Sequence, residues 1–148
     1  MFPNILTDYK NHKWLSEREI LAAKNKDVHE INNIILTKIW DQAVIYKSFD
    51  TLESNEAVNY PSEFLNSLEL QGFASHTLQL KIGVSIILLQ NINPLKFCNC
   101  TWFSVKKKKT MENLIEATIL TGPSEGEAVL IPRIPMIPKD LPFQFKKL

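Results

Sequence analysis

The second half of this sequence consists of short apolar segments separated by residues that favour turns, and this pattern constrains the fold most strongly. The segment TLQLKIGVSIILLQN alternates from Thr77 to Lys81, breaks at Gly83 and resumes through Leu89. TWFSVKKK, LIEATIL and EAVLIPRIPMI follow at short spacing. Such segments predict a small antiparallel sheet or barrel, in which the prolines of the last segment place it at an edge or make it irregular. The turn residues between the segments are Asn93-Pro94, Gly122-Pro123 and Gly126.

The first half of the sequence has a different pattern of apolar residues. REILAAKN, at Arg18–Asn25, predicts a buried strand, and it leads directly into KDVHEINNIILTKIW. There, Asp27 and Glu30 have the spacing of a capping box, and the apolar residues that follow recur with helical periodicity. A strand followed by an amphipathic helix is half of a βαβ unit, so we expect an α/β beginning. The apolar residues of the helical face are Val28, Ile31, Ile34, Ile35 and Ile39.

Three further elements complete the predicted order. Residues Ala43–Asp50, AVIYKSFD, predict a second strand. The acidic stretch Asp50–Glu56 predicts a loop, and Pro61 opens a helix of one or two turns.

Composition excludes several classes of protein. A chain of 148 residues with 45% hydrophobic and 22% charged residues is typical of about one globular domain. Its net charge of +1 gives no overall attraction to nucleic acid or anionic membrane. The longest apolar run, Val84–Leu89 apart from Ser85, is far too short to span a bilayer, and the first residues lack a signal-peptide core. We expect an intracellular protein, with nucleus or cytoplasm undecided and no membrane partner.

The sequence lacks the parts that hold and hydrolyse a nucleotide. A phosphate loop needs glycines and a lysine, and magnesium needs acidic ligands. The only candidate, Gly122–Glu127, has no lysine and carries two carboxylates that would repel a triphosphate. No two acidic residues are adjacent, and we expect Arg18 and Arg133, the only arginines, to make structural hydrogen bonds. We therefore predict no catalytic residues and no cofactor in this chain.

Histidines and cysteines also give no clear site. His12, His29 and His76 are widely separated, so nothing in the sequence supports a Ser/His/Asp or Cys/His arrangement. Cys98 and Cys100 supply only two of the four ligands of a zinc site and would bridge poorly in an extended chain. We predict no metal site.

Four blocks of the chain together resemble one known family. They are WLSEREILAAKNKDVHEINNIIL, AVNYPSEFLNSL, LQLKIGVSIILLQNINPLKFCNCTWFSV and IEATILTG with the following GEAVLIPRIPMIPKDLPFQFKKL. In this order and spacing they resemble PIF-type ATP-dependent DNA helicases, superfamily 1B enzymes with 5′-to-3′ polarity that act in DNA repair and recombination. The version carried by Helitron-like mobile elements is the most similar.

The resemblance implies an α+β fold with three parts. Residues 1–60 would be a partial RecA-like segment of the second motor domain, and 61–110 the small SH3-like antiparallel β-barrel called the 2B domain. Residues 111–148 would be strands that return toward the motor domain. The family uses ATP and Mg²⁺, and its partners would be single-stranded DNA and the rest of a helicase motor.

The turn before the predicted strand TWFSVKKK differs from the family. Where relatives typically read Asn-Gly-Thr-Arg, this chain reads Asn99-Cys100-Thr101-Trp102. Asn-Gly supplies positive φ angles with little strain, so a cysteine at the glycine position should cost on the order of 1 kcal/mol. Trp102, and Gln90 in LLQN, also replace arginines, which weakens the case for unaided DNA binding.

The lysine run permits two interpretations. The first is a solvated strand end. In the second, the lysines contact phosphates while neighbouring aromatic side chains stack on a base, without sequence preference. The candidate residues for this weak nucleic-acid site are Lys106, Lys107, Lys108, Lys109, Trp102 and Phe103.

Three functional hypotheses follow. The first is a helicase fragment that is inactive alone. The second is a non-catalytic module that binds single-stranded nucleic acid, and the third is a protein-interaction domain that supplies a strand to an intact helicase. Because the sheet expected around Arg18–Asn25 is incomplete, we also expect an exposed edge that favours association.

Overall fold

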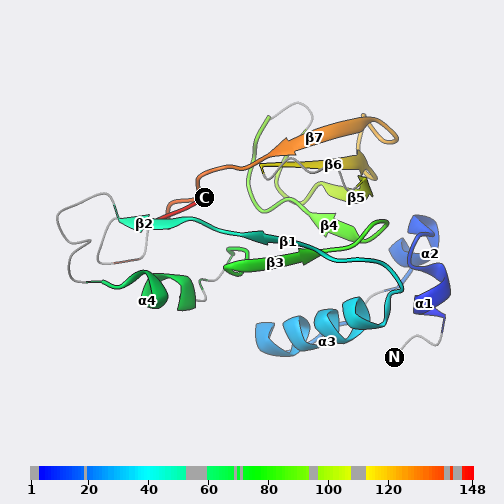
Figure 1. Ribbon diagram of the computed structural model, residues 1–148. Coiled ribbons are helices and arrows are strands. Elements are labelled where there is room, and N and C mark those ends of the chain that lie inside the picture. The colour runs from blue at the N-terminus through cyan, green and yellow to red at the C-terminus, as the bar shows by residue number, and fades with distance from the viewer. Residues whose placement is uncertain are drawn as a thin grey trace.

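A computed structural model describes residues 4–18, 20–52, 60–68, 70, 72–93, 97–107, 113–138, 141 and 145–148. These residues form a mixed helical and antiparallel β structure (Figure 1). The helices are α1 (Ile5–Asp8), α2 (His12–Ser16), α3 (Asn25–Lys38) and α4 (Ser62–Ser67). The strands are β1 (Val44–Lys47), β2 (Asp50–Leu52), β3 (Thr77–Leu80), β4 (Ser85–Ile87), β5 (Trp102–Lys107), β6 (Leu114–Ile119), β7 (Ala128–Pro132) and β8 (Phe145–Lys147).

The largest sheet has the order β4-β5-β6-β7 with antiparallel neighbours, as the short, turn-bounded segments predict. Alternate residues of these strands point to opposite faces, which defines an inner and an outer face. On the inner face Phe103 pairs with Ile119, and both are almost fully buried. Leu88, Ile92 and Phe97, from the connection between β4 and β5, cover this face. The result is a small core between a sheet and a loop.

Within the described residues this sheet is open. β4 and β7 are its two edges, so the structure contains antiparallel sheets but not the closed barrel that the resemblance implies. The edge position of β7 confirms the interpretation of its prolines, because proline cannot donate a hydrogen bond to a neighbouring strand. β6 and β7 belong to the same sheet as β4 and β5, so the sheet continues across the predicted boundary at residue 110.

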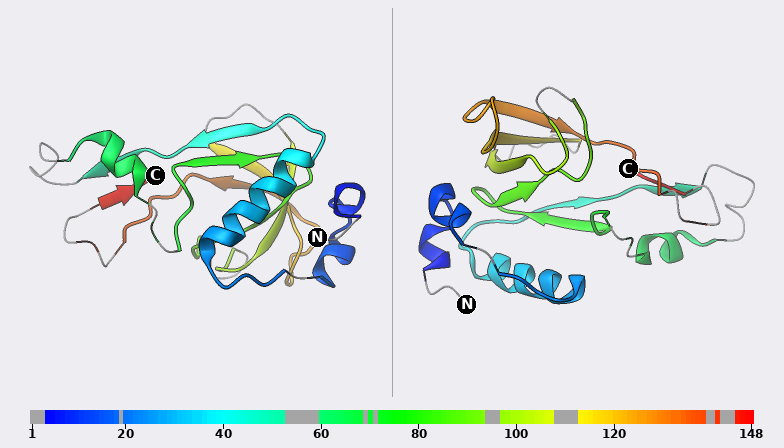
Figure 2. Two further views of the ribbon diagram at one scale, coloured as in Figure 1. Left: turned by 90° about the horizontal axis from the view of Figure 1, so that it is seen from below. Right: turned by 180° about the vertical axis from the view of Figure 1, so that it is seen from behind.

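Two smaller sheets join segments that are distant in the sequence. β1 pairs with β3, and β2 pairs with β8, both antiparallel. The β1–β3 pair lies between the four-stranded sheet and α3 (Figures 1 and 2). Pairing of β2 with β8 brings the last residues of the chain back to its first third, beside the end of β1.

The predicted strand at Arg18–Asn25 is wrong. Apart from Asn25, which begins α3, the described residues of this range form coil between α2 and α3, and Leu21 is 91% exposed. Arg18 instead donates from its guanidinium to the Trp14 carbonyl at 2.8 Å, which extends the end of α2. A short apolar run needs neighbouring strands to become a buried strand, and none of the described strands lies beside this one.

The predicted α/β beginning is not confirmed, because the described residues before α3 contain no strand and β1 pairs with β3 in antiparallel orientation. The helix itself is confirmed as α3, although its capping box is not. Its N-cap is Lys24, which makes no side-chain cap bond, and Asp27 lies inside the first turn. A carboxylate there still interacts favourably with the free N–H groups of the helix end.

The predicted strand Ala43–Asp50 is divided into two. Ser48 N–H donates to the His76 carbonyl at 2.8 Å and Phe49 N–H donates to the Leu148 carbonyl at 2.8 Å, so the chain changes partner between them. Asp50–Leu52, predicted as the start of a loop, is β2, and residues 53–59 lie outside the described part. The short helix after Pro61 is confirmed as α4.

Gly83 lies in the connection between β3 and β4, which joins the β1–β3 pair to the large sheet. The break in the strand pattern that the sequence predicts at this glycine is confirmed. The Gly83 N–H donates to the Val105 carbonyl at 2.7 Å, and its φ of 83° lies in the left-handed region. The residue is buried, and a Cβ placed there would lie 2.9 Å from Cγ of Lys10.

Gly83→Ala should therefore lower the free energy of unfolding by about 1–2 kcal/mol, measured by urea denaturation. Gly72→Ala is the matched control, because Gly72 has a φ of 79° but no atom within 4 Å of an added Cβ. We expect Gly83→Ala to cost more than the control and Lys10→Ala to remove the excess. Equal costs for the two glycine changes would contradict this account.

Candidate nucleic-acid interface

The structure separates the two aromatic residues of the predicted site. Trp102 lies on the outer face of β5 and is 47% exposed, whereas Phe103 points to the inner face and is 0% exposed. Phe103 packs against Phe97 with ring centroids 6.2 Å apart. It is a core residue and its ring cannot stack on a base, which corrects its place among the candidate residues.

Trp102 belongs to an apolar region of the outer face. Its strand partner Ile87 is 44% exposed, and Leu130 on β7, on the same face by register, is 55% exposed. Ser104 lies on the same face of β5, and it pairs with Ser85 on β4 and with Thr118 on β6. Because Ser104 is only 8% exposed, the part of this face that is open to a flat, partly apolar ligand such as a nucleobase is the exposed pair Trp102 and Ile87.

Lys106 is displaced from the regular strand. The pairing register between β5 and β6 shifts between Val105 and Lys107, so that Lys107 pairs with Glu116 and Lys106 is the extra residue of a bulge. Lys106 is exposed. Lys108 and Lys109 lie outside the described residues, as does the side chain of Lys107. Lys106 and Trp102 are thus the two candidate residues with described, exposed side chains.

The turn before β5 has the conformation that the sequence predicts. Thr101 N–H donates to the Cys98 carbonyl at 3.1 Å, which closes a β-turn, and Cys100 has a φ of 68°. Cys100 is the one described residue other than glycine with a positive φ. Asn99 N–H donates to Oδ1 of Asn91 at 2.6 Å, which holds the turn against the preceding loop.

The glycine-containing segment Gly122–Glu127 is the connection between β6 and β7. The N–H groups of Glu125, Gly126 and Glu127 donate to backbone carbonyls within this connection and at the end of β6, at 3.2, 2.9 and 3.2 Å. A phosphate loop must instead direct such groups at its ligand. The hydrogen bonding here is that of a strand connection.

The fold brings together Ser48, His76 and Asp50, a group that the sequence analysis missed. Ser48 Oγ lies 2.9 Å from His76 Nδ1, and Asp50 Oδ2 lies 3.3 Å from the same nitrogen. A catalytic triad needs serine and aspartate on different ring nitrogens, so this geometry does not activate Ser48 as a nucleophile. The group could be found only from the strand pairing, because His76 comes from a segment well separated in the sequence from Ser48 and Asp50.

Asp50 has a structural role in this cluster. Its side chain is fully buried, and Oδ2 lies 3.9 Å from Nζ of Lys147, its partner in the β2–β8 register. The carboxylate therefore faces a cation on β8 and a histidine beside β3. Neither oxygen of Asp50 nor Nζ of Lys147 has a hydrogen-bond partner among the described residues, so the 3.9 Å ion pair is what offsets the cost of burying these two charges where β2 meets β8.

Both arginines make structural contacts, as expected. Arg133 donates to the carbonyls of Lys47 at 2.6 Å and Leu148 at 3.1 Å, and it lies over the Phe49 ring, 5.0 Å from its centroid. Arg18 lies 4.4 Å from the centroid of the Trp14 ring.

His12 on α2 is partly buried, and this burial lowers the pKa of its imidazole below the usual value.

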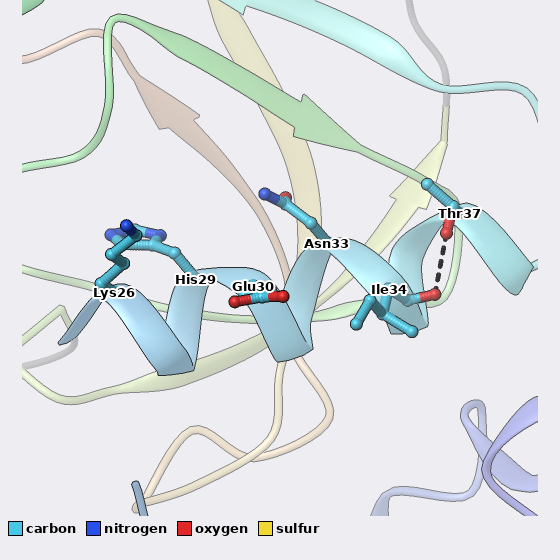
Figure 3. Close-up of a pocket in the computed structure, with 6 residues that line it drawn as sticks. All are labelled: Lys26, His29, Glu30, Asn33, Ile34 and Thr37. Atoms are coloured by element: carbon cyan, nitrogen blue, oxygen red, sulfur yellow. Dashed lines mark hydrogen bonds between the residues drawn. The ribbon is translucent and has the colours of Figure 1, made fainter. Parts of the chain in front are cut away.

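An open groove of about 460 Å³ runs along α3 (Figure 3). Its lining residues all come from this one helix, and the Thr37 hydroxyl already donates to the Ile34 carbonyl at 2.8 Å. With one helix as its wall, the groove does not enclose a ligand. The lining residues are Lys26, His29, Glu30, Asn33, Ile34 and Thr37.

Within the described ranges no three His, Cys, Asp or Glu side chains are grouped to hold a metal ion, and no helix could span a membrane.

Residues 63–107, which contain α4, β3, β4 and β5, match the family model for the 2B domain of DNA helicase Pif1. Over these residues the chain is similar to a Pif1-type 2B domain. This match confirms the resemblance to PIF-type helicases that the four sequence blocks carry.

The crystal structure of Pif1 helicase from Candida albicans is similar to this chain, with a TM-score of 0.59 at 18% sequence identity. The similarity covers 85% of this chain and 32% of that one, so the chain spans about a third of the helicase. At this identity the likeness shows a shared fold, which extends on both sides of the matched 2B residues. No curated protein matches the chain.

The left-handed Cys100 provides a test of the turn within this 2B domain. Cys100→Gly should raise the free energy of unfolding by up to about 1 kcal/mol, because glycine adopts this φ without a Cβ clash. Cys98→Gly is the control, since Cys98 has no positive φ and a glycine there relieves no strain. Chemical denaturation of both variants measures the difference. A Cys100→Gly variant less stable than the parent would contradict the account.

Proposed function

We propose that this chain is part of an ATP-dependent 5′-to-3′ DNA helicase and contributes its 2B domain and adjoining motor segments. The observation that carries the proposal is the 2B match at residues 63–107, set within a helicase-like fold that extends over most of the chain. In this proposal ATP and Mg²⁺ are held by other parts of the enzyme. An intracellular location, nuclear or cytoplasmic, remains a prediction.

The proposed domain division keeps a partial RecA-like motor segment at residues 1–60. The SH3-like 2B unit begins near residue 61, and the continuous sheet favours extending it through β7 to Pro132 instead of ending it at 110. The shared core supports this extension, because Phe103 on β5 packs with Ala117 and Ile131 on β6 and β7. The remaining residues, through β8, return to the motor segment by pairing with β2.

We further propose that single-stranded DNA contacts the outer face of the sheet along β5. Trp102 offers an exposed ring for base stacking, and Lys106 is exposed at a bulge four residues along the strand. Lys107, Lys108 and Lys109 follow directly in the sequence and add cations for phosphates. Stacking and phosphate contacts do not distinguish bases, so binding should tolerate any sequence.

Fluorescence anisotropy with a labelled single-stranded oligonucleotide at two salt concentrations tests this contact. Each lysine that contacts a phosphate should contribute about −0.7 to the slope of log affinity against log salt, so Lys106→Ala should make the slope shallower. Trp102→Ala should weaken binding on the order of tenfold with little change in the slope, because stacking is uncharged.

Lys26→Ala is the matched control, because this lysine lies on α3, apart from β5. We expect the control to bind like the parent. Binding that does not depend on salt, or equal losses from Lys26→Ala and Lys106→Ala, would contradict the proposed contact.

A further inference from the structure

Two exposed thiols lie within a single turn of this chain. Cys98 and Cys100 occupy the first and third positions of the β-turn that ends with Thr101, and neither forms a disulfide. Both side chains are exposed. Exposure is the first requirement for thiol chemistry, since buried cysteines are shielded from oxidants.

The turn corrects the sequence-based objection to a bridge between these residues. In an extended strand, residues two apart are separated by about 6.6 Å, close to the upper limit of about 6.8 Å between the Cα atoms of a disulfide. A β-turn folds the chain back and shortens that separation. The left-handed Cys100, with a φ of 68°, is the residue that reverses the chain direction here.

The turn is also fixed in place. Cys100 N–H donates to the Leu88 carbonyl at 2.9 Å, and Leu88 N–H donates to the Thr101 carbonyl at 3.0 Å. These bonds continue the β4–β5 ladder up to the turn and hold both cysteines next to Trp102. Cys100 Sγ donates to Asn99 Oδ1 at 3.7 Å, a contact weak enough to yield to a new bond.

We propose that Cys98 and Cys100 form a dithiol site that a disulfide oxidant converts to a reversible intraturn disulfide. One cysteine thiolate attacks a sulfur of the oxidant, and a thiolate of the oxidant leaves. The second cysteine thiolate then attacks the protein sulfur of the mixed disulfide and releases the other half of the oxidant. The two cysteines are oxidised by two electrons in total, the oxidant is reduced to two thiols, and two protons pass from the cysteines to them.

The small ring formed across one intervening residue is strained, and strained or exposed disulfides are the more easily reduced ones. The bridge should therefore open again with a thiol reductant. This chemistry is independent of the proposed helicase function, because it depends only on the turn and its two thiols.

Mass spectrometry of the full chain treated with oxidised glutathione tests the proposal, with remaining thiols alkylated before digestion. The parent chain should lose two hydrogens, retain no glutathione, resist alkylation at both cysteines and recover both thiols with dithiothreitol. Cys98→Ser and Cys100→Ser, which are conservative changes at exposed positions, should each retain one glutathione.

Three results would overturn the proposal. They are glutathione retained on the parent chain as the main product, disulfide-linked dimers as the main product, or no reaction at either cysteine. Circular dichroism of the two serine variants would verify that they fold like the parent, so that their glutathione adducts report on a native turn.

Discussion

The inner face of the β4–β7 sheet is the constraint on which the rest of the structure depends. Phe103, Ala117 and Ile119 are each at most 1% exposed, and the loop between β4 and β5 closes over them. Burying a side chain such as phenylalanine contributes about 2–3 kcal/mol, so these few residues supply much of the stability of a small unit. Their alternation along β5 also determines which residues remain for function. Because Phe103 faces inward, Trp102 must face outward.

Polar contacts then attach the two small sheets to this core. Arg133, directly after β7, reaches the carbonyls of Lys47 and Leu148 and so connects the ends of β1 and β8. Asp50 lies between Lys147 and His76, which ties β2–β8 to β3. These contacts hold together segments distant in the sequence. They explain why a Ser, His and Asp can meet here for a structural reason, without the geometry of a nucleophile and its base.

The sequence predicted the features that depend on local pattern. The periodicity of α3, the break at Gly83, the positive φ at Cys100 and the edge position of β7 are confirmed because each follows from neighbouring residues. Arg18–Asn25 was predicted wrongly because burial of an apolar run depends on neighbours that the run itself does not specify. The group around Asp50 could not be predicted, since it exists only through strand pairings between residues nearly 100 positions apart. Phe103 could have been assigned to the core from its alternation with Trp102, but the adjacent lysine run favoured a surface interpretation.

The central proposal is that this chain contributes a 2B domain and adjoining segments to a helicase and does not turn over ATP by itself. The hydrogen bonds of Gly122–Glu127 support this proposal, because the N–H groups of Glu125, Gly126 and Glu127 donate to carbonyls of this loop and of Ile119 at the end of β6. The most direct test is ATP turnover by the purified chain, with Mg²⁺ and saturating single-stranded DNA. The account predicts phosphate release no greater than that from a protein-free control, with or without DNA. DNA-stimulated hydrolysis of many ATP molecules per chain would contradict it.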